Sequence, residues 1–461
     1  MQPFRYHVLA CDQHKPDGLP CCKGHGAAEV IALLRKELAR LGLLDEVQVT
    51  VTGSLGLCER GPNWVVYPDG VWYSGVTPAD VLEIVTEHFQ QGKPVERLRN
   101  PSESSVKAEI IANRNRMLGA QKAQDAAGVL PDDFQELIRG YQSSRIVLTA
   151  IELDIFSEVA RSGEQANATT LSNTLGTEAR GTETLLNALV ALSLLTKEGG
   201  VYANGLVATR YLAFGAPDDA RAALKHNLSL WNTWSSLTDR LRTGKPVDFT
   251  SMAQRGAEDW TVPFIAAMHR NAAHRAPLVV RSVGADGVRR LLDIGGGSGA
   301  YSIAFAQSNP TLSADIFDLA TVLPIAEGHV ANAGLSARVR TRAGDLTRDD
   351  FGGKSGDSYD LVLLSAICHM LGPDENLDLL KRAHAALMPG GRVAIQDHVM
   401  NDNGTAPRAG ALFAINMLVG TPNGSSFSLT QYRQWLVQAG FSDVQHVRLP
   451  GPNDLLLARK A

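Results

Sequence analysis

The chain has 461 residues, of which 44% are hydrophobic and 20% charged, and its formal net charge is -4. This length exceeds one ordinary core, so two or three domains are expected. The near balance of charges gives no overall basic field to attract nucleic acid or anionic lipid, and small-molecule or protein partners are expected instead. No signal peptide and no run of about 18 apolar residues is visible, which predicts a cytoplasmic protein without membrane spans.

Residues 1–100 are predicted to form a small α/β domain. A short apolar run at Tyr6–Ala10 leads through a loop rich in Cys, Pro and Gly to residues 27–41, where apolar residues have helical spacing. Residues 47–51, 64–67 and 71–73 predict strands, and Pro78 opens a helix expected to end near Gln91. Residues 101–133 are polar, with a proline near each end, and we interpret them as a linker with room for one helix.

Residues 134–215 are predicted to form a helical domain with a β wing. Helical patterns cover 134–160, 170–175 and 183–195, and extended pieces follow around a Glu-Gly-Gly turn at 197–204. This order is typical of a winged helix. Residues 184–192 are almost wholly apolar, so this helix is expected to be buried, which disfavours DNA binding and favours packing against a second subunit in a homodimer.

Residues 216–461 are predicted to be a helical connector followed by a catalytic domain. From Val288 onward strands and helices alternate, which is typical of a doubly wound, Rossmann-like parallel sheet. The predicted elements are 290–294, 301–307, 314–317, 323–333, 339–343, 361–365, 376–387 and 392–396.

A glycine-rich loop follows the first of these strands. Gly295, Gly297 and Ala300 satisfy the loose dinucleotide pattern, so NAD is one possible ligand of the loop. Asp318 ends the second strand and suits ribose hydroxyls, and Asp345 ends the third and suits an adenine amino group. This ordered set favours S-adenosylmethionine over NAD. The residues expected to bind the cofactor are Asp293, Gly295, Gly296, Gly297, Asp318, Leu319, Asp345 and Leu346.

Residues 291–460 resemble the catalytic domain of the plant-type O-methyltransferase family, whose relatives include acetylserotonin and bacterial small-molecule enzymes. The motifs that carry the resemblance occur in the family's order: Leu292–Gly299, Phe317–Leu319, Gly344–Asp345, Ile367–His369 and Ala414–Leu418. Residues 134–212 resemble the winged-helix dimerisation domain of the same family. The resemblance implies a homodimeric enzyme that transfers a methyl group from S-adenosylmethionine to a hydroxyl.

His369 is the candidate base. It follows the strand predicted at 361–365, so it is expected at the same edge of the sheet as the cofactor. A neutral imidazole there can take the proton of a hydroxyl while its oxygen attacks the sulfonium methyl. Asp397 ends the next strand, and we expect it to orient the His369 ring by accepting its second N–H. Cys368 is expected to be a small buried neighbour of the base.

The chain departs from the family's pattern beside this histidine. Met370 and Leu371 follow it, where the family often has Asp and Trp, and Ser365 replaces a lysine that packs near adenine in plant members. The family's second orienting acid is missing from Ser425–Thr430. These departures put a plant-like acceptor in doubt. They leave methyl transfer intact, because that reaction requires mainly alignment and a proton sink.

The acceptor pocket is expected to include Trp231, Met268, Asn416 and Met417, because the resemblance places such residues over the substrate. Ordinary core packing is the alternative for each of them. The acceptor is expected to be a small molecule with a phenolic, enolic or similar hydroxyl, and the sequence does not choose among these.

Four of the five cysteines lie in the first 58 residues, which in a reducing cytosol suggests metal or redox chemistry before disulfides. Residues 6–98 resemble thioredoxin-like [2Fe-2S] ferredoxins, notably at Val65–Tyr73 and Gly92–Val95. That resemblance implies four ligand positions, which are Cys11, Cys22, Ser54 and Cys58. Serine is a harder and poorer ligand than cysteine, and Cys21 is a potential substitute for it. A bound cluster and a degenerate domain used for structure or partner binding therefore both stay open.

The sequence thus predicts an O-methyltransferase fused to a ferredoxin-like domain. One alternative is a redox enzyme that uses the methyltransferase scaffold to hold its substrate, with electrons from the N-terminal domain and a redox partner protein. Another is a binding protein without catalysis. The predicted segments are 1–100, 101–133, 134–215 and 216–461.

Overall fold

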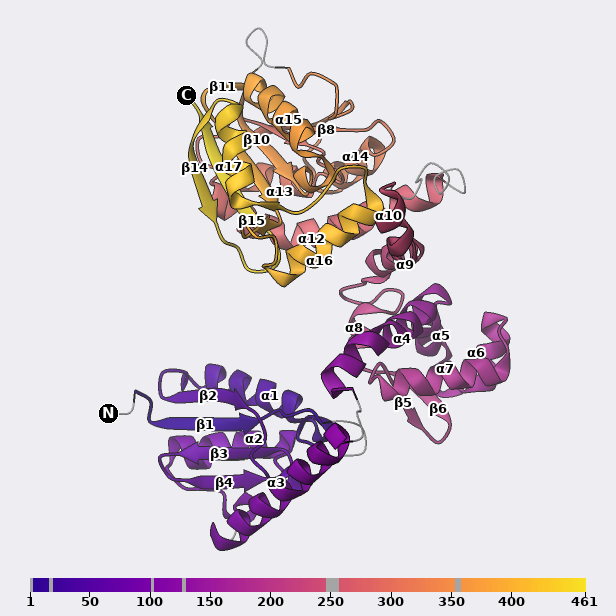
Figure 1. Ribbon diagram of the computed structural model, residues 1–461, viewed down its shortest axis with the longest axis vertical. Helices are drawn as coiled ribbons and strands as arrows, with labels where there is room; N and C mark the ends of the chain where they lie inside the picture. Colours follow the sequence, from indigo (N-terminus) through magenta and orange to yellow (C-terminus); the bar gives the residue numbers. More distant parts are fainter. Residues whose placement is uncertain (1–2, 16–19, 101–102, 127–129, 246–256, 353–357) are drawn as a thin grey trace. The chain divides into compact units, whose positions relative to one another are not determined.

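The computed structural model describes residues 3–15, 20–100, 103–126, 130–245, 257–352 and 358–461 (Figure 1). The chain divides into two compact units, Met1–Gly140 and Tyr141–Ala461, and each is described by itself. Within the described residues, no helix has both the length and the apolar character needed to cross a membrane.

The first unit contains a four-stranded sheet in the order β2-β1-β3-β4. Its strands are β1 (Tyr6–Cys11), β2 (Val47–Thr52), β3 (Asn63–Tyr67) and β4 (Val71–Ser74), and β1 runs parallel to β2 but antiparallel to β3. Its helices are α1 (Ala27–Arg40) and α2 (Pro78–Glu83), and α2 continues as a π-helical segment at Ile84–Gln90. The apolar face of α1 packs on Trp64 and Tyr73, which confirms the predicted small α/β domain.

The predicted linker is mainly one long helix. α3 (Glu103–Ala126) belongs to the first unit, and it buries Val106 and Asn113. Its polar composition explains why the sequence suggested a linker, since only a narrow stripe of the helix meets the domain. The compact domain therefore continues beyond residue 100.

Helices and one β-hairpin form the first part of the second unit. The helices are α4 (Asp132–Glu152, which begins before this unit), α5 (Ile155–Ser162), α6 (Ala168–Leu175), α7 (Ala179–Ala191), α8 (Leu206–Tyr211), α9 (Arg221–Ser235), α10 (Leu237–Thr243) and α12 (Ala257–Val283). The hairpin pairs β5 (Leu195–Glu198) with β6 (Val201–Asn204).

Two local predictions in this region were inaccurate. The helix expected over 134–160 is interrupted, because Asp154 adopts a left-handed conformation with φ 55°. The helix expected over 183–195 ends at Ala191, and Leu195 belongs to a strand. Within one chain, the predicted apolar helix buries Thr182, Leu186 and Leu189, and its opposite face is left for the second subunit that the sequence predicts.

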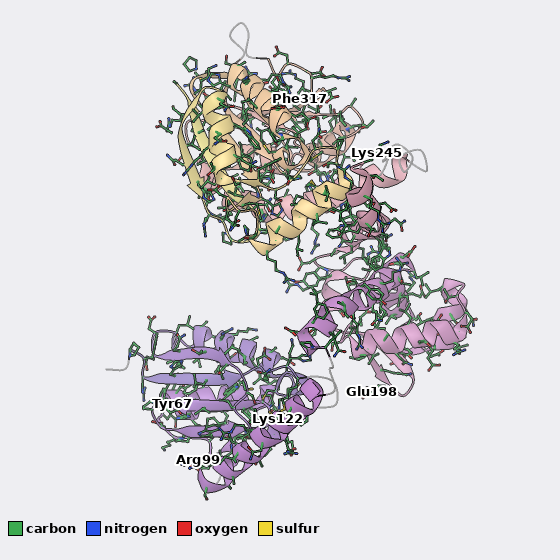
Figure 2. All side chains as sticks on the ribbon, viewed as in Figure 1. Tyr67, Arg99, Lys122, Glu198, Lys245 and Phe317 are labelled. Atoms are coloured by element: carbon green, nitrogen blue, oxygen red, sulfur yellow. The ribbon has the colours of Figure 1, made fainter. Side chains whose placement is uncertain are left out.

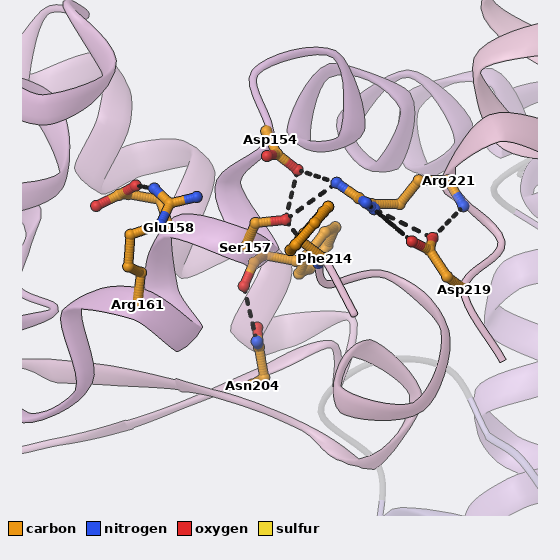
Figure 3. A network of polar contacts seen from close by, with 9 residues as sticks. Asp154, Ser157, Glu158, Arg161, Asn204, Phe214, Asp219 and Arg221 are labelled. Atoms are coloured by element: carbon orange, nitrogen blue, oxygen red, sulfur yellow. Dashed lines mark hydrogen bonds and ion pairs between the residues drawn. The ribbon is translucent and has the colours of Figure 1, made fainter. Parts of the chain in front are cut away.

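A polar network fastens the start of α9 to α5 (Figure 3). Arg221 donates to Asp154 over 3.1 Å and forms a two-oxygen ion pair with Asp219. Ser157 accepts a hydrogen bond from the backbone N–H of Phe214 at 2.8 Å. These contacts set the direction in which α9 leaves the helical domain, and α9 carries Trp231.

The rest of the second unit is a seven-stranded sheet in the order β14-β15-β11-β10-β7-β8-β9. The strands are β7 (Arg290–Ile294), β8 (Ser313–Asp318), β9 (Val339–Ala343), β10 (Tyr359–Ser365), β11 (Leu387–Asp397), β14 (Phe441–Val447) and β15 (Asp454–Lys460). The helices are α13 (Ala300–Ser308), α14 (Leu323–Asn332), α15 (Pro373–Ala386), α16 (Arg408–Gly420) and α17 (Leu429–Gln438). A two-residue ladder joins β12 (Val399–Met400) to β13 (Phe427–Ser428).

Both faces of this sheet are buried. On β10, Val362 and Leu364 belong to the core shared with α15 and α17, and Leu361 and Leu363 belong to the core shared with α12, α13 and α14. This explains the uninterrupted apolar runs of the central strands. The predicted Rossmann-like sheet is confirmed, but it is not wholly parallel, because β15 runs antiparallel to β11 and β14.

Candidate functional site

The carboxyl ends of five parallel strands, β7 to β11, meet at one edge of the sheet. The glycine loop follows β7, Asp318 ends β8, Asp345 follows β9, and His369 lies in the short helix after β10. Asp397 ends β11. The topology therefore gathers these sequence-predicted residues on the side where open α/β sheets bind their ligands.

At Gly295, Gly296 and Gly299 the glycine loop leaves no room for a side chain. Gly295 has φ +68°, and a Cβ there would lie 2.3 Å from Cδ1 of Ile367. A Cβ at Gly296 would lie 2.9 Å from Cγ of Asp293. The loop is anchored by the backbone N–H of Gly295, which donates to the carbonyl of Phe317 at 2.7 Å. Its remaining peptide groups are thus held for close approach by a ligand.

Asp318 is fixed by backbone donors. Its Oδ2 accepts from the N–H of Gly297 at 2.8 Å, and its Oδ1 accepts from the N–H of Leu319 at 2.7 Å. Burial raises the pKa of this carboxyl above its usual range, although the two N–H donors oppose the shift. Each oxygen keeps a lone pair that can accept a ligand hydroxyl.

Asp293 lies beneath the loop and is 1% exposed. The hydroxyl of Ser302 donates to its Oδ2 at 2.8 Å. Burial raises the pKa of Asp293 to about 6. Because it is enclosed beneath Gly296, its position supports the loop and gives no direct surface for a ligand.

Asp345 and Leu346 follow β9. Both Asp345 oxygens have local partners: Oδ1 accepts from the N–H and hydroxyl of Thr347, and Oδ2 lies 3.3 Å from Nε of Arg348. The Thr347 donors lower the pKa of Asp345. Leu346 packs beside the loop, 3.5 Å from the place of a Cβ on Gly295, as expected of an apolar cover. Nearby, Phe317 (labelled in Figure 2) packs edge to face on Phe351, with ring centroids 5.0 Å apart.

His369 and Asp397 form a buried pair. Nδ1 of His369 lies 2.7 Å from Oδ1 of Asp397, and the backbone N–H of His369 donates to Oδ2 at 3.1 Å. The backbone N–H of His398 donates to Oδ1 at 2.8 Å. Asp397 is fully buried, and the side chain of His369 is 10% exposed. The carboxylate thus fixes the ring through Nδ1, so that Nε2 is the ring atom left for an acceptor.

Phe413 was missed by the sequence analysis. Its ring meets His369 edge to face at 4.8 Å and stacks on His398 at 4.3 Å. Phe413 lies three residues before Asn416 on α16, so a helical projection from the predicted Asn416 could have found it. It forms an apolar wall beside the candidate base.

The four candidate acceptor residues lie on three helices, with Trp231 on α9, Met268 on α12 and Asn416 and Met417 on α16. Both α12 and α16 pack against α9. The partner of Asn416 is the neighbouring Trp234, whose Nε1 donates to Oδ1 of Asn416 at 2.9 Å. Met417 is 8% exposed, which is also what core packing would give.

A groove of about 730 Å³ lies beside this contact. It is mainly apolar, and its lining comes from α4, α9 and the segment between α7 and β5. Trp231 and Trp234 both line it, whereas Met268, Asn416 and Met417 are not among its lining residues. Its volume lies in the range of small-molecule pockets.

Of the four N-terminal cysteines, only Cys11 and Cys22 contact each other among the described side chains. The Cys22 thiol hydrogen-bonds to Cys11, which lowers the pKa of Cys11 and raises that of Cys22. Separately, Ser54 Oγ lies 3.3 Å from Cys58 Sγ, and Nζ of Lys15 donates to the same sulfur at 2.8 Å. In the part of the chain that the structure describes, no group of three or more His, Cys, Asp or Glu side chains could hold a metal ion. These residues do not fit a site of four thiolate ligands. Lys15 donates to the sulfur of Cys58, and Ser54 offers a hydroxyl where the resemblance requires a fourth thiolate.

Comparisons with known proteins agree with the geometry at the sheet edge. A model of the O-methyltransferase domain matches residues 234–442, and a model of the O-methyltransferase dimerisation domain matches residues 135–213. The 3-hydroxy-5-methyl-1-naphthoate 3-O-methyltransferase of Streptomyces sahachiroi is 33% identical over 337 residues, which are 72% of this chain and 96% of the relative.

Two further relatives cover the same share of the chain. The tetracenomycin polyketide synthesis 8-O-methyl transferase TcmO of Streptomyces glaucescens is 29% identical over 335 residues, which are 72% of this chain and 97% of that protein. The solved structure of an O-methyltransferase family protein from Burkholderia thailandensis has a TM-score of 0.65 and 26% identity, and the match covers 72% of this chain and 99% of that one. The two family models leave residues 1–134 unmatched.

Proposed function

Because the chain belongs to the O-methyltransferase family, it is an S-adenosylmethionine-dependent O-methyltransferase of small aromatic metabolites, and we propose that His369 is its catalytic base. The observation that carries this proposal is the 2.7 Å contact between Nδ1 of His369 and Asp397. It leaves Nε2 to accept the proton of the acceptor hydroxyl. Bound S-adenosylmethionine supplies an electrophilic methyl group on its sulfonium.

We further propose that the glycine loop and three flanking side chains hold this cofactor. The backbone of Gly295–Gly297 lies close to it, Asp318 accepts its ribose hydroxyls, and Leu346 covers the adenine. Asp345 is the weaker member of the set, because Thr347 and Arg348 already occupy its oxygens. Asp293 supports the loop from below, and Leu319 contributes the N–H that holds Asp318.

For the acceptor, we propose an aromatic compound of more than one ring. The groove lined by Trp231 and Trp234 is large and apolar, and aromatic walls favour flat apolar ligands. Two relatives are named for a naphthoate and for tetracenomycin polyketide synthesis. Met268, Asn416 and Met417 are proposed to complete the pocket from α12 and α16.

Mass spectrometry after incubation with S-adenosylmethionine tests the function. A panel of hydroxylated benzenes, naphthalenes and larger fused rings is expected to show a gain of one methyl, greatest for the multi-ring compounds. Activity confined to single-ring phenols would contradict the proposed acceptor class. Absence of both methyl transfer and S-adenosylmethionine binding would contradict the assigned activity itself.

The dimerisation domain indicates self-association, and we propose a homodimer formed through residues 135–213. Sedimentation of the full chain at several concentrations tests this assembly. A monomer at every concentration would contradict it.

The [2Fe-2S] cluster, the redox partner protein and the redox alternative stay predictions. They depend on the resemblance of residues 6–98 to ferredoxins, and the Lys15–Cys58 contact opposes the cluster. Iron and sulfide analysis of anaerobically purified protein decides this. Two irons and two sulfides per chain would support the cluster, and absence of both would remove it.

A further inference from the structure

α3 lies across the loop that carries Cys58. The side chain of Ile110 approaches Gly56 so closely that a Cβ at Gly56 would lie 2.9 Å from its Cγ2. One turn further along the helix, Nδ2 of Asn113 donates to the carbonyl of Gly56 at 2.6 Å. Asn113 is 8% exposed, so this bond is made away from solvent.

Two ion pairs connect the same helix and loop. Nε and Nη2 of Arg60 in the loop donate to the two carboxylate oxygens of Glu109 on α3. Glu59 of the loop pairs with Arg116 of α3 at 3.1 Å. The helix and the loop therefore each contribute one positive and one negative side chain. This charge complementarity sets the register of the helix on the loop.

The same loop holds a small polar cluster around Cys58, between the residues that α3 contacts at Gly56 and at Glu59 and Arg60. Cys58 is 4% exposed, and its sulfur accepts from the ammonium of Lys15 and lies 3.3 Å from the Ser54 hydroxyl. Lys15 is itself 9% exposed. Ser54 is exposed, but the Cys58 thiol and Lys15 are buried, so solvent scarcely reaches this potential reactive group while the loop is covered.

The attachment of α3 is weak for so long a helix. Its apolar contacts come mainly from Val106 and Ile110, while Ile111, Met117 and Leu118 are 38%, 38% and 55% exposed. Exposed ion pairs contribute little, typically about 0–1 kcal/mol each. Elements with few buried contacts open at lower free energy than the domain core.

We propose that α3 is a lid over the Cys58 thiol, closed by Ile110, Asn113 and the two ion pairs and able to open without unfolding of the domain. In the closed state the lid keeps soft electrophiles and any partner protein away from the sulfur. In the open state the Cys58 thiol becomes accessible, whereas Cys11, Cys21 and Cys22, which are 1%, 7% and 1% exposed, keep their burial.

Iodoacetamide labelling of the full chain, followed by peptide mass spectrometry, tests the lid. In the labelling reaction the Cys58 sulfur forms a bond to carbon as iodide leaves, and the thiol proton passes to the buffer. Ile110→Asp is expected to speed labelling of Cys58 by about tenfold or more, since the rate follows the open population. Cys11 and Cys22 should keep their wild-type rates. Ile111→Asp is the matched control, because this neighbour is 38% exposed, and it should label as wild type does.

A charge exchange gives an independent test. Arg60→Glu should also speed labelling of Cys58, and adding Glu109→Arg should return the rate towards wild type, because the double variant restores the pair with reversed signs. Two outcomes overturn the proposal. One is that Cys58 in the folded wild-type protein is labelled at the same rate as in the protein unfolded by urea. The other is Cys11, Cys22 and Cys58 accelerating together in both Ile110→Asp and Arg60→Glu, which would make α3 part of the core.

Discussion

Nδ1 of His369 and Oδ1 of Asp397 lie 2.7 Å apart, although 28 residues separate them along the chain. The parallel pairing of β10 with β11 creates this contact, because it brings the ends of both strands to one edge. Oδ1 also accepts from the N–H of His398, and Oδ2 accepts from the N–H of His369. The carboxylate is therefore held on both oxygens before it orients the imidazole.

Replacing His369 tests the base. His369→Ala is expected to lower turnover by roughly 10²-fold or more, because the acceptor proton then passes to water. The affinity for S-adenosylmethionine, measured by calorimetry, should not change, because the glycine loop does not use this ring. Unchanged turnover would instead indicate catalysis by alignment alone.

Asp397→Asn should lower turnover by at least about tenfold. An amide offers one acceptor oxygen where three N–H groups now bind, so its NH₂ group must face either the backbone N–H of His369 or Nδ1 of the ring. Both arrangements disturb the ring. Asp402→Asn, an exposed change five residues further on, is the control and should leave the rate unaltered. Equal effects of the two variants would argue against an orienting role.

Gly295→Ala is expected to weaken S-adenosylmethionine binding by at least about tenfold, since a left-handed backbone costs an alanine roughly 1–2 kcal/mol. The new methyl would also lie 2.3 Å from Ile367. Calorimetry measures the loss, and Gly328→Ala on α14, where a Cβ meets nothing within 4 Å, should bind normally. Adding Ile367→Ala to Gly295→Ala should recover the part of the lost affinity that comes from the contact between the new methyl and Ile367. Normal binding by Gly295→Ala would contradict a ligand held by this loop.

The bond between Trp234 and Asn416 is expected to position α16 at the acceptor. Trp234→Phe and Asn416→Leu should each raise KM for the acceptor, and a double-mutant cycle should give a coupling of about 0.5–1.5 kcal/mol. Trp231→Phe, three residues earlier on the same helix, should not couple to Asn416→Leu. Additive effects of Trp234→Phe and Asn416→Leu would show that the bond does not matter for binding.

The buried carboxyl of Asp293 should make stability depend on pH. Its pKa is raised from 3.8 to about 6, so the folded chain holds a proton that the unfolded chain releases between these values. The contribution of the Asp293 carboxyl to the free energy of unfolding is fully present below pH 3.8 and is lost as the pH rises through about 6. Urea unfolding of the cofactor-free protein measures it. Asp293→Asn, which keeps an acceptor for Ser302, should be more stable than wild type near pH 8 and lose that advantage near pH 4. An advantage that does not vary with pH would contradict this assignment.

Much of the catalytic sheet could be predicted from local pattern. The strands at 290–294 and 339–343 were placed with their observed bounds, because strands and helices alternate regularly in this part of the chain. The glycine-rich loop 295–299 was recognisable from its composition, and at Gly295, Gly296 and Gly299 close contacts exclude a side chain. The reversed direction of β15 was not predicted, because periodicity indicates a strand but not the orientation of its neighbours.

Residues that act through distant partners were missed for a related reason. Trp234 was passed over in favour of Trp231, since only the packing of α9 on α16 shows which indole reaches Asn416. The region expected to be a linker with one helix contains that helix, but its contacts were not predicted, because residues such as Asn113 and Gly56 lie 57 positions apart in the chain.

The amino-acid sequence by itself determined the sheet's central strands, the glycine loop and the candidate pair His369 and Asp397, because strand periodicity and the steric demand of a tight loop are local properties. Only the tertiary structure decided that Phe413 walls the base, that Trp234 holds Asn416, and that Lys15 and α3 enclose Cys58. These are contacts between elements far apart in the chain. They depend on which faces pack together, and amphipathic spacing leaves that choice open.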